Sequence, residues 1–94
     1  MYSSMHQTPG RILWERNQQD VKNRLEWAFS NQRSSNMGLR ANALYVLSEY
    51  YRYGWGGVQE DEKRADNYLR ESAGLGHARA CYEFVRKYSS RELP

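Results

Sequence analysis

Hydrophobic residues recur at helical spacing through most of this chain. In the first third, the residues that keep this spacing are Trp14, Val21, Leu25, Ala28 and Phe29. Side chains three, four or seven positions apart share one face of an α-helix, so the pattern predicts a helix of about five turns from Pro9 to the polar loop 31–36. Thr8 can cap this helix, and Pro9 suits its first position. The alternative is a break near 17–19, with Asp20 capping a new helix.

Three more helices are predicted after the polar loop. The second runs over about 37–53 and ends at a glycine-rich turn. The third starts behind Asp61, where acidic residues suit the positive end of the helix dipole, and ends near 74–76. The fourth covers about 78–88. No segment alternates like a strand and β-branched residues are few, so the expected fold class is all-α, built from antiparallel helix pairs.

One hydrophobic pattern occurs twice. Three residues recur 37 positions later, namely Ala43, Leu47 and Tyr51 as Ala80, Phe84 and Tyr88. A period of this size marks stacked units of two helices. We therefore expect one domain over 1–94, with 41–76 as its one full unit and loose tails at 1–8 and 89–94. The residues expected to be buried between helices are Leu47, Tyr51, Tyr68 and Phe84.

The repeated pattern, the glycine-rich turn and the closing Gly-x-Ala-x-Ala follow one another in a specific order. The residues concerned are Ala43, Leu47, Tyr51, Gly54, Gly57, Val58, Asp61, Arg64, Ala65, Tyr68, Ser72, Ala73, Gly76, Ala78 and Ala80. Over 41–88, about half of the chain, they resemble the Sel-one-like repeat family, a relative of the tetratricopeptide repeat. The chain departs from the family pattern by an extra glycine in the turn, by Arg64 for Lys and Ser72 for Ala, and by having one full repeat.

The resemblance implies a superhelix of helix pairs that binds another protein. Larger members of the family act as scaffolds and adaptors in signalling, secretion and cell-envelope regulation. A unit this small would bridge few partners, so we expect an adaptor or inhibitor that docks on one protein and modulates it. An immunity protein or an anti-host factor would fit equally, and the residues do not identify the partner.

The candidate binding surface follows from the geometry of stacked helix pairs, in which the first helix of each unit lines the concave side. Residues a quarter-turn from the packed positions then face outward, and Trp55 sits at the tip of the turn. The predicted partner-binding residues are Tyr45, Glu49, Arg52, Trp55, Arg79, Tyr82 and Arg86. Tyrosine and arginine are frequent in binding hot spots. The alternatives are that the tyrosines complete the core and that Trp55 is tucked over the hairpin.

The composition fits a small domain rich in aromatic residues. The chain has 94 residues, with eight tyrosines, three tryptophans, two phenylalanines and a formal net charge of +3. The basic excess lies before residue 58, where seven Arg and Lys face four Asp and Glu, and this is not a concentrated basic stripe. Cys81 is the one cysteine, and no apolar signal segment or membrane-spanning run is present, so we expect a cytoplasmic protein.

No motif predicts catalysis, a cofactor or a metal. His77 and Cys81 are too few ligands for zinc, and a Cys–His nucleophile pair needs a third group to orient the base. We interpret Cys81 as a small buried residue and His77 as an exposed turn residue. The glycines at 54–57 lack the Gly-Lys-Ser/Thr of a phosphate loop and instead indicate a tight turn. The expectation is a protein that is not an enzyme.

Two further interpretations stay open. The first is single-stranded nucleic-acid binding by the N-terminal half, where Trp14 and Trp27 lie among basic residues. These basic residues are Arg11, Arg16, Lys22, Arg24, Arg33 and Arg40. Core packing explains the tryptophans better, so nucleic acid is not the expected partner. The second is a homodimer, because a stack of one unit leaves an apolar end exposed unless it is capped.

Overall fold

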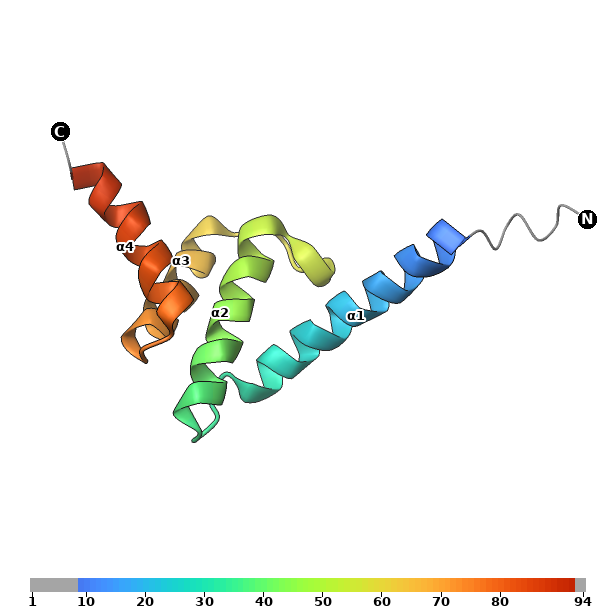
Figure 1. Cartoon of the computed structure of the whole chain (residues 1–94), viewed down its shortest axis with the longest axis horizontal. Helices are drawn as coiled ribbons and strands as arrows, with labels where there is room; N and C mark the ends of the chain where they lie inside the picture. Colours follow the sequence, from blue (N-terminus) through green and yellow to red (C-terminus); the bar gives the residue numbers. More distant parts are fainter. Residues whose placement is uncertain (1–8, 93–94) are drawn as a thin grey trace, which may run out of the picture.

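The polar loop and the glycine-rich turn divide the chain into four helices, shown in Figure 1. The computed structural model describes the backbone of residues 9–92 and the side chains of residues 17–89, so the expected tail at 1–8 with its Thr8 cap lies outside the described residues. The elements are α1 (Pro9–Asn31), α2 (Met37–Tyr53), the short 3-10 turn η2 (Trp55–Gly57), α3 (Glu62–Gly74) and α4 (Ala78–Glu92). No strand occurs over residues 9–92, and the predicted all-α fold is confirmed.

The ends of α2 and α3 are set by capping residues. The Asn36 side chain accepts a hydrogen bond from the Leu39 amide at 3.0 Å and starts α2. Gly54 ends α2 in the left-handed conformation, with φ 71°, and its amide bonds the Tyr50 carbonyl. Asp61 accepts from the Arg64 amide at 3.0 Å and starts α3, as its position before the acidic first turn predicted.

The extents of α1 and α4 test two of the sequence predictions. Helix α1 is continuous from Pro9 to Asn31, so the alternative break with a cap at Asp20 is wrong. Helix α4 continues to Glu92, so the prediction of a loose tail is wrong for residues 89–92. The segment Ser-Ser-Arg-Glu contains neither glycine nor proline, and Pro94 is the first residue after Tyr88 that opposes helix, so the backbone hydrogen bonds of α4 continue.

Helix α2 is the centre of the core. Figure 1 shows α1 and α4 running away from it on opposite sides. The core residues that pack together are Leu25, Ala28, Ala43, Val46, Leu47, Tyr50, Tyr51 and Ala65, drawn from α1, α2 and α3. The predicted burial is confirmed for Leu47 and Tyr51, whose exposed fractions are 0% and 9%. It is wrong for Tyr68 and Phe84, which are half-buried because each lies at an edge of the described packing.

Buried hydroxyl groups connect neighbouring helices. The Ser72 hydroxyl on α3 donates to the Ala41 carbonyl on α2 at 2.7 Å, and both residues are buried. The Tyr50 hydroxyl on α2 donates to the Val21 carbonyl on α1 at 2.7 Å. These bonds satisfy polar groups inside the helix packing, where an unbonded hydroxyl would be costly. They therefore fix the position of α3 and α1 on α2.

The extra glycine of the turn allows η2 to pack closely on two helices. Gly56 has φ 67° in the left-handed region, and a Cβ there would lie 3.0 Å from the Tyr50 ring and 3.1 Å from the Leu25 side chain. A side chain at this position would therefore be strained in its backbone, and its Cβ would crowd the side chains of Tyr50 and Leu25. The glycine at position 56 therefore has a local packing reason.

Leu47→Ala should lower the free energy of unfolding by about 2–5 kcal/mol, because the side chain is fully buried and its removal leaves a cavity. Urea denaturation followed by circular dichroism measures the change. Met37→Ala, at a position that is 60% exposed, is the control and should change the free energy by less than about 0.5 kcal/mol. An unfolding midpoint for Leu47→Ala equal to that of the unchanged chain would contradict the placement of α2.

Candidate functional site

A polar cluster lies where the first turns of α4 meet the middle of α2. The Tyr45 hydroxyl is 2.8 Å from Glu83 Oε2 and 3.3 Å from Glu49 Oε2. The Tyr45 ring stacks on the His77 ring at 4.6 Å between centroids. Arg79 Nε lies 2.8 Å from the same Glu83 oxygen. Two carboxylates, one hydroxyl and one guanidinium therefore share a small region between α2 and α4.

The cluster supplies few hydrogen-bond donors to the Glu49 carboxylate. The Tyr45 hydroxyl has one hydrogen, and the shorter distance shows that it donates chiefly to Glu83. Within residues 17–89, no ion pair within 4.0 Å involves Glu49, whereas Glu83 is paired with Arg79. Burial raises the pKa of Glu49, and burial followed by the bond to Glu83 raises the pKa of Tyr45. Glu49 is thus a half-buried acid without a direct ion pair among residues 17–89.

His77 holds the cluster in place through both ring nitrogens. Nδ1 accepts the Ala80 amide at 3.1 Å, so Nδ1 carries no hydrogen and the hydrogen is on Nε2. Nε2 then donates to Asn42 Oδ1 at 3.1 Å on α2. His77 therefore caps α4 and bonds to α2, and the prediction of an exposed turn residue is wrong. Cys81 is half-buried rather than buried, with Sγ 3.3 Å from the Ala73 carbonyl.

The structure brings four of the predicted binding residues together. Tyr45 and Glu49 on α2 lie beside Arg79 on α4, and the Arg79 guanidinium is 5.8 Å from the centre of the Tyr82 ring. Tyr82 is 57% exposed. With Glu83, which the sequence analysis did not select, these residues form what we call the Tyr45 face, consisting of Tyr45, Glu49, Arg79, Tyr82 and Glu83. Arg86 is exposed one turn further along α4.

Arg52 is engaged within the molecule. Its guanidinium lies 3.2 Å from Asp66 and 3.6 Å from Glu62, and its side chain is 20% exposed. Lys87 Nζ lies 2.7 Å from Asp66 and 2.8 Å from Glu62. Burial alone would raise the pKa of Asp66, but the bonds and charges of Lys87 and Arg52 lower it below its ordinary value. These ion pairs join α2, α3 and α4, so Arg52 has a structural role.

Trp55 lies beyond the end of α2, and its ring contacts are with tyrosines. The ring stacks on Tyr53 at 4.9 Å and meets the Tyr50 ring edge-on at 5.6 Å. It nevertheless stays 45% exposed, so each of the two alternatives for Trp55 is partly right. Its ring contacts are one turn and more away from Tyr45, and we leave it out of the Tyr45 face.

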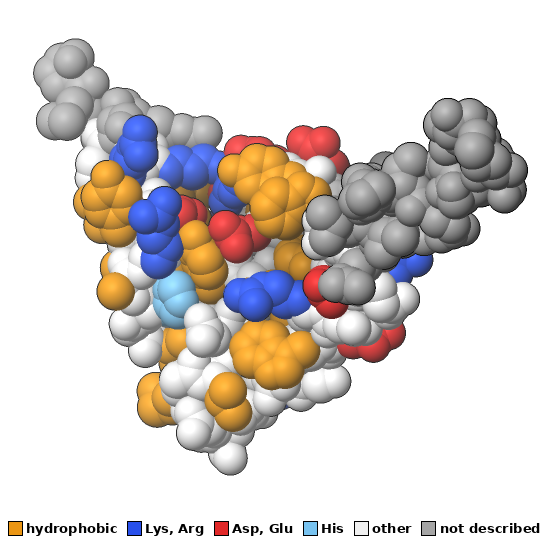
Figure 2. Space-filling view, turned by 45° about the vertical axis from the view of Figure 1, so that its right-hand side comes forward, with side chains coloured by type: hydrophobic (Ala, Val, Ile, Leu, Met, Phe, Trp, Pro, Cys, Tyr) orange, Lys and Arg blue, Asp and Glu red, His pale blue; other side chains and the backbone are white. Residues whose placement is uncertain are grey.

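Helix α1 contributes to this side of the molecule, which the sequence analysis missed. A hollow of about 410 Å³ is lined by Asn23, Arg24, Trp27 and Asn42. Asn42 also bonds His77, so the hollow adjoins the Tyr45 face. Trp27 is 36% exposed there, although the helical pattern placed it in the core. Figure 2 shows the face that carries the histidine, where hydrophobic, basic and acidic side chains lie next to one another.

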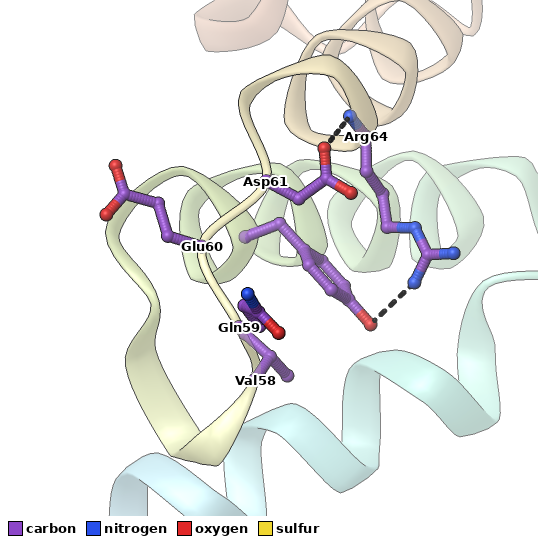
Figure 3. A pocket seen from close by; sticks show the side chains of 6 residues that line it. Val58, Gln59, Glu60, Asp61 and Arg64 are labelled. Carbon is purple, nitrogen blue, oxygen red and sulfur yellow. Dashed lines mark hydrogen bonds between the residues drawn. The ribbon is translucent and has the colours of Figure 1, made fainter.

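A second hollow, of about 490 Å³, lies by the turn before α3 (Figure 3). Its polar groups bond one another, since Arg64 donates to the Tyr51 hydroxyl at 3.3 Å and its amide donates to Asp61. The described residues contain no group of three potential metal ligands. No helix among them is long and apolar enough to cross a bilayer. A third hollow, of about 510 Å³, is lined by Gln32, Arg33, Arg40, Leu44, Tyr68 and Glu71. We take the Tyr45 face as the candidate site because it brings together four of the predicted binding residues.

Comparisons with known protein families, with curated proteins and with solved structures found no match to this chain. The resemblance to the Sel-one-like repeat family therefore stays a prediction.

Glu49→Gln should stabilise the protein at pH 7 and not near pH 3.5. Burial raises the pKa of Glu49 in the folded chain, so ionisation favours unfolding once the pH exceeds the ordinary carboxyl range of roughly 4. Below that range the carboxyl is neutral in both states. Glutamine keeps an acceptor oxygen for Tyr45 without the charge.

Thermal unfolding at the two pH values measures this effect. Glu60→Gln, at an exposed position in the turn before α3, should leave the unfolding midpoint unchanged at both. An unchanged or lower midpoint for Glu49→Gln at pH 7 would show that Glu49 is already stabilised as an anion.

Proposed function

We propose that this protein is a small protein-interaction module, an adaptor or inhibitor, that binds a partner protein through the Tyr45 face. The observation that carries the proposal is the half-buried Glu49, which has no ion-pair partner within residues 17–89 and lies beside exposed aromatic surface. The charges of Arg24 and Arg79 lower the pKa of Glu49, but burial outweighs them, so this half-buried carboxylate without a direct ion pair costs folding stability. The lost stability is recovered on binding when a cation of the partner pairs with the Glu49 carboxylate.

The chemistry of the face indicates the kind of partner. A lysine or arginine side chain entering beside Tyr45 would pair with Glu49, since Arg79 already occupies Glu83. Charged pairs at such partly buried positions give specificity and slow dissociation. Tyr82, 57% exposed, offers a rigid ring for apolar contact next to that cation. We therefore expect a partner segment that places a basic residue next to apolar ones.

Nucleic-acid binding is the competing function. The exposed Trp27 and the neighbouring Arg24 favour it, because bases stack on such side chains. Against it stand Glu49 and Glu83, which would repel phosphates on the adjoining face. The arrangement favours a basic protein segment.

A photoreactive benzoylphenylalanine in place of Tyr82 should crosslink one protein in an extract of cells that make this chain. The same group in place of Tyr53, which is 58% exposed and is the last residue of α2, is the matched control and should not crosslink it. Adding Glu49→Gln to the Tyr82 probe should remove the crosslink. A crosslink that persists with Glu49→Gln would contradict binding through the Tyr45 face.

Calorimetric titration of that purified protein gives the size of the effect. Glu49→Gln and Tyr82→Ala should each weaken binding by more than about 1 kcal/mol, whereas Glu60→Gln should not. Tight binding of a single-stranded oligonucleotide, with steep salt dependence and loss on Trp27→Ala, would instead support the nucleic-acid function.

A further inference from the structure

Equivalent positions of α2 and α4 differ sharply in exposure. The positions that correspond through the 37-residue repeat are Leu44, Leu47, Ser48 and Tyr51 on α2 and Cys81, Phe84, Val85 and Tyr88 on α4. The four residues on α2 have exposed fractions of 3%, 0%, 1% and 9%. On α4, Val85 is 58% exposed and the other three are half-buried. We call these four positions the outer face of α4.

The difference has an identifiable cause. Helix α3 covers α2, since Tyr68 of α3 stacks on Tyr51 at 5.7 Å and shares a hollow with Leu44. No helix of the described chain takes the corresponding place on α4. The same hydrophobic spacing is therefore covered on α2 but leaves Val85 exposed on α4, and a helix equivalent to α3 would cover Val85.

Helix α1 shows the opposite deficiency. Helix α3 packs between α2 and α4, whereas α1 packs chiefly on α2 and the turn η2. Leu25 and Ala28 are buried against α2, while Trp27 remains 36% exposed over the hollow beside Asn42. In chain order α1 precedes α2 as α3 precedes α4. Helix α3 thus has a helix on each of two sides, whereas α1 has a helix, α2, on one side. Within residues 9–92, helix α4 in turn has α3 on one side and lacks a second helix on the other.

We propose that the outer face of α4 binds α1 of a second copy of this chain. Within the described chain, the outer face of α4 lacks a covering helix, and α1 lacks a second neighbouring helix. A contact between α1 of one copy and α4 of the other would supply both. Helices α1 and α4 also run outward on opposite sides of α2 (Figure 1). Residues 17–31 contain two acidic and two basic residues, so no net charge opposes the contact.

This contact joins different surfaces on the two copies. Such a heterologous contact continues the stack from one copy to the next, whereas a contact of α4 with α4 would close a two-fold dimer. A mutation in one of the two surfaces therefore leaves the other surface able to bind. Variants that are altered in different surfaces can be mixed to test the contact.

Light scattering coupled to size exclusion at roughly 100 µM should give a mass at least twice that of the monomer for the unchanged chain. Val85→Glu should reduce it to the monomer, because a charge replaces an exposed apolar contact. Met37→Glu, at a position 60% exposed at the start of α2, is the matched control and should still associate. Trp27→Glu should also be monomeric. If circular dichroism shows that Trp27→Glu has lost helix, Asn23→Glu is used in its place, because Asn23 is exposed in the same hollow.

Mixing the two monomeric variants decides the geometry. The Val85→Glu chain keeps its α1 and the Trp27→Glu chain keeps its outer face of α4, so an equimolar mixture should form a dimer that grows no further. Monomer mass for the unchanged chain, association of Val85→Glu alone or a mixture that stays monomeric would each overturn the proposal. Glu49→Gln should associate normally, so failure of the Tyr45 face and failure of this contact are distinguishable.

Discussion

The fold depends on the burial of α2 between α1 and α3. Leu47 and Val46 of α2 are almost completely removed from water, and α1 and α3 each supply part of the cover. In so small a domain this one layer contributes much of the apolar burial available. Because two sides of α2 are covered, only the strip with Tyr45 and Glu49 remains for solvent and for α4. The position of the candidate site is a consequence of the core.

Two polar clusters join α2 to α4, and they differ in their balance of charge. In the first, Arg52 and Lys87 face two acids, Glu62 and Asp66, so each charge has a partner. In the second, Glu49 and Glu83 share one tyrosine hydrogen and one arginine. The first cluster therefore fixes α4 on the other helices. The second leaves an acid incompletely neutralised, and this imbalance distinguishes a binding surface from a structural contact.

Local signals in the sequence predicted the helices well. The caps at Gly54 and Asp61 depend on neighbouring residues, and the burial of Leu47 follows from helical spacing. Contacts between distant residues were not predictable in this way. Arg52 pairs with Asp66, 14 positions away on another helix, and the repeat pattern does not show which side chains meet there. The exposure of Trp27 in the hollow beside Asn42 was missed because helical spacing groups Trp27 with the apolar residues of α1.

Helix α1 is uneven along its length, and this has a consequence for its motion. Residues 17–20 are exposed on all sides, whereas Val21 is half-buried and its carbonyl accepts the Tyr50 hydroxyl. The backbone amides of residues 17–20 have helical hydrogen bonds and exposed side chains, so they should exchange with deuterium through local opening. The backbone amides of α1 after Val21 should exchange only when the contact between α1 and α2 breaks. Val21 therefore marks a boundary between two exchange regimes within one continuous helix.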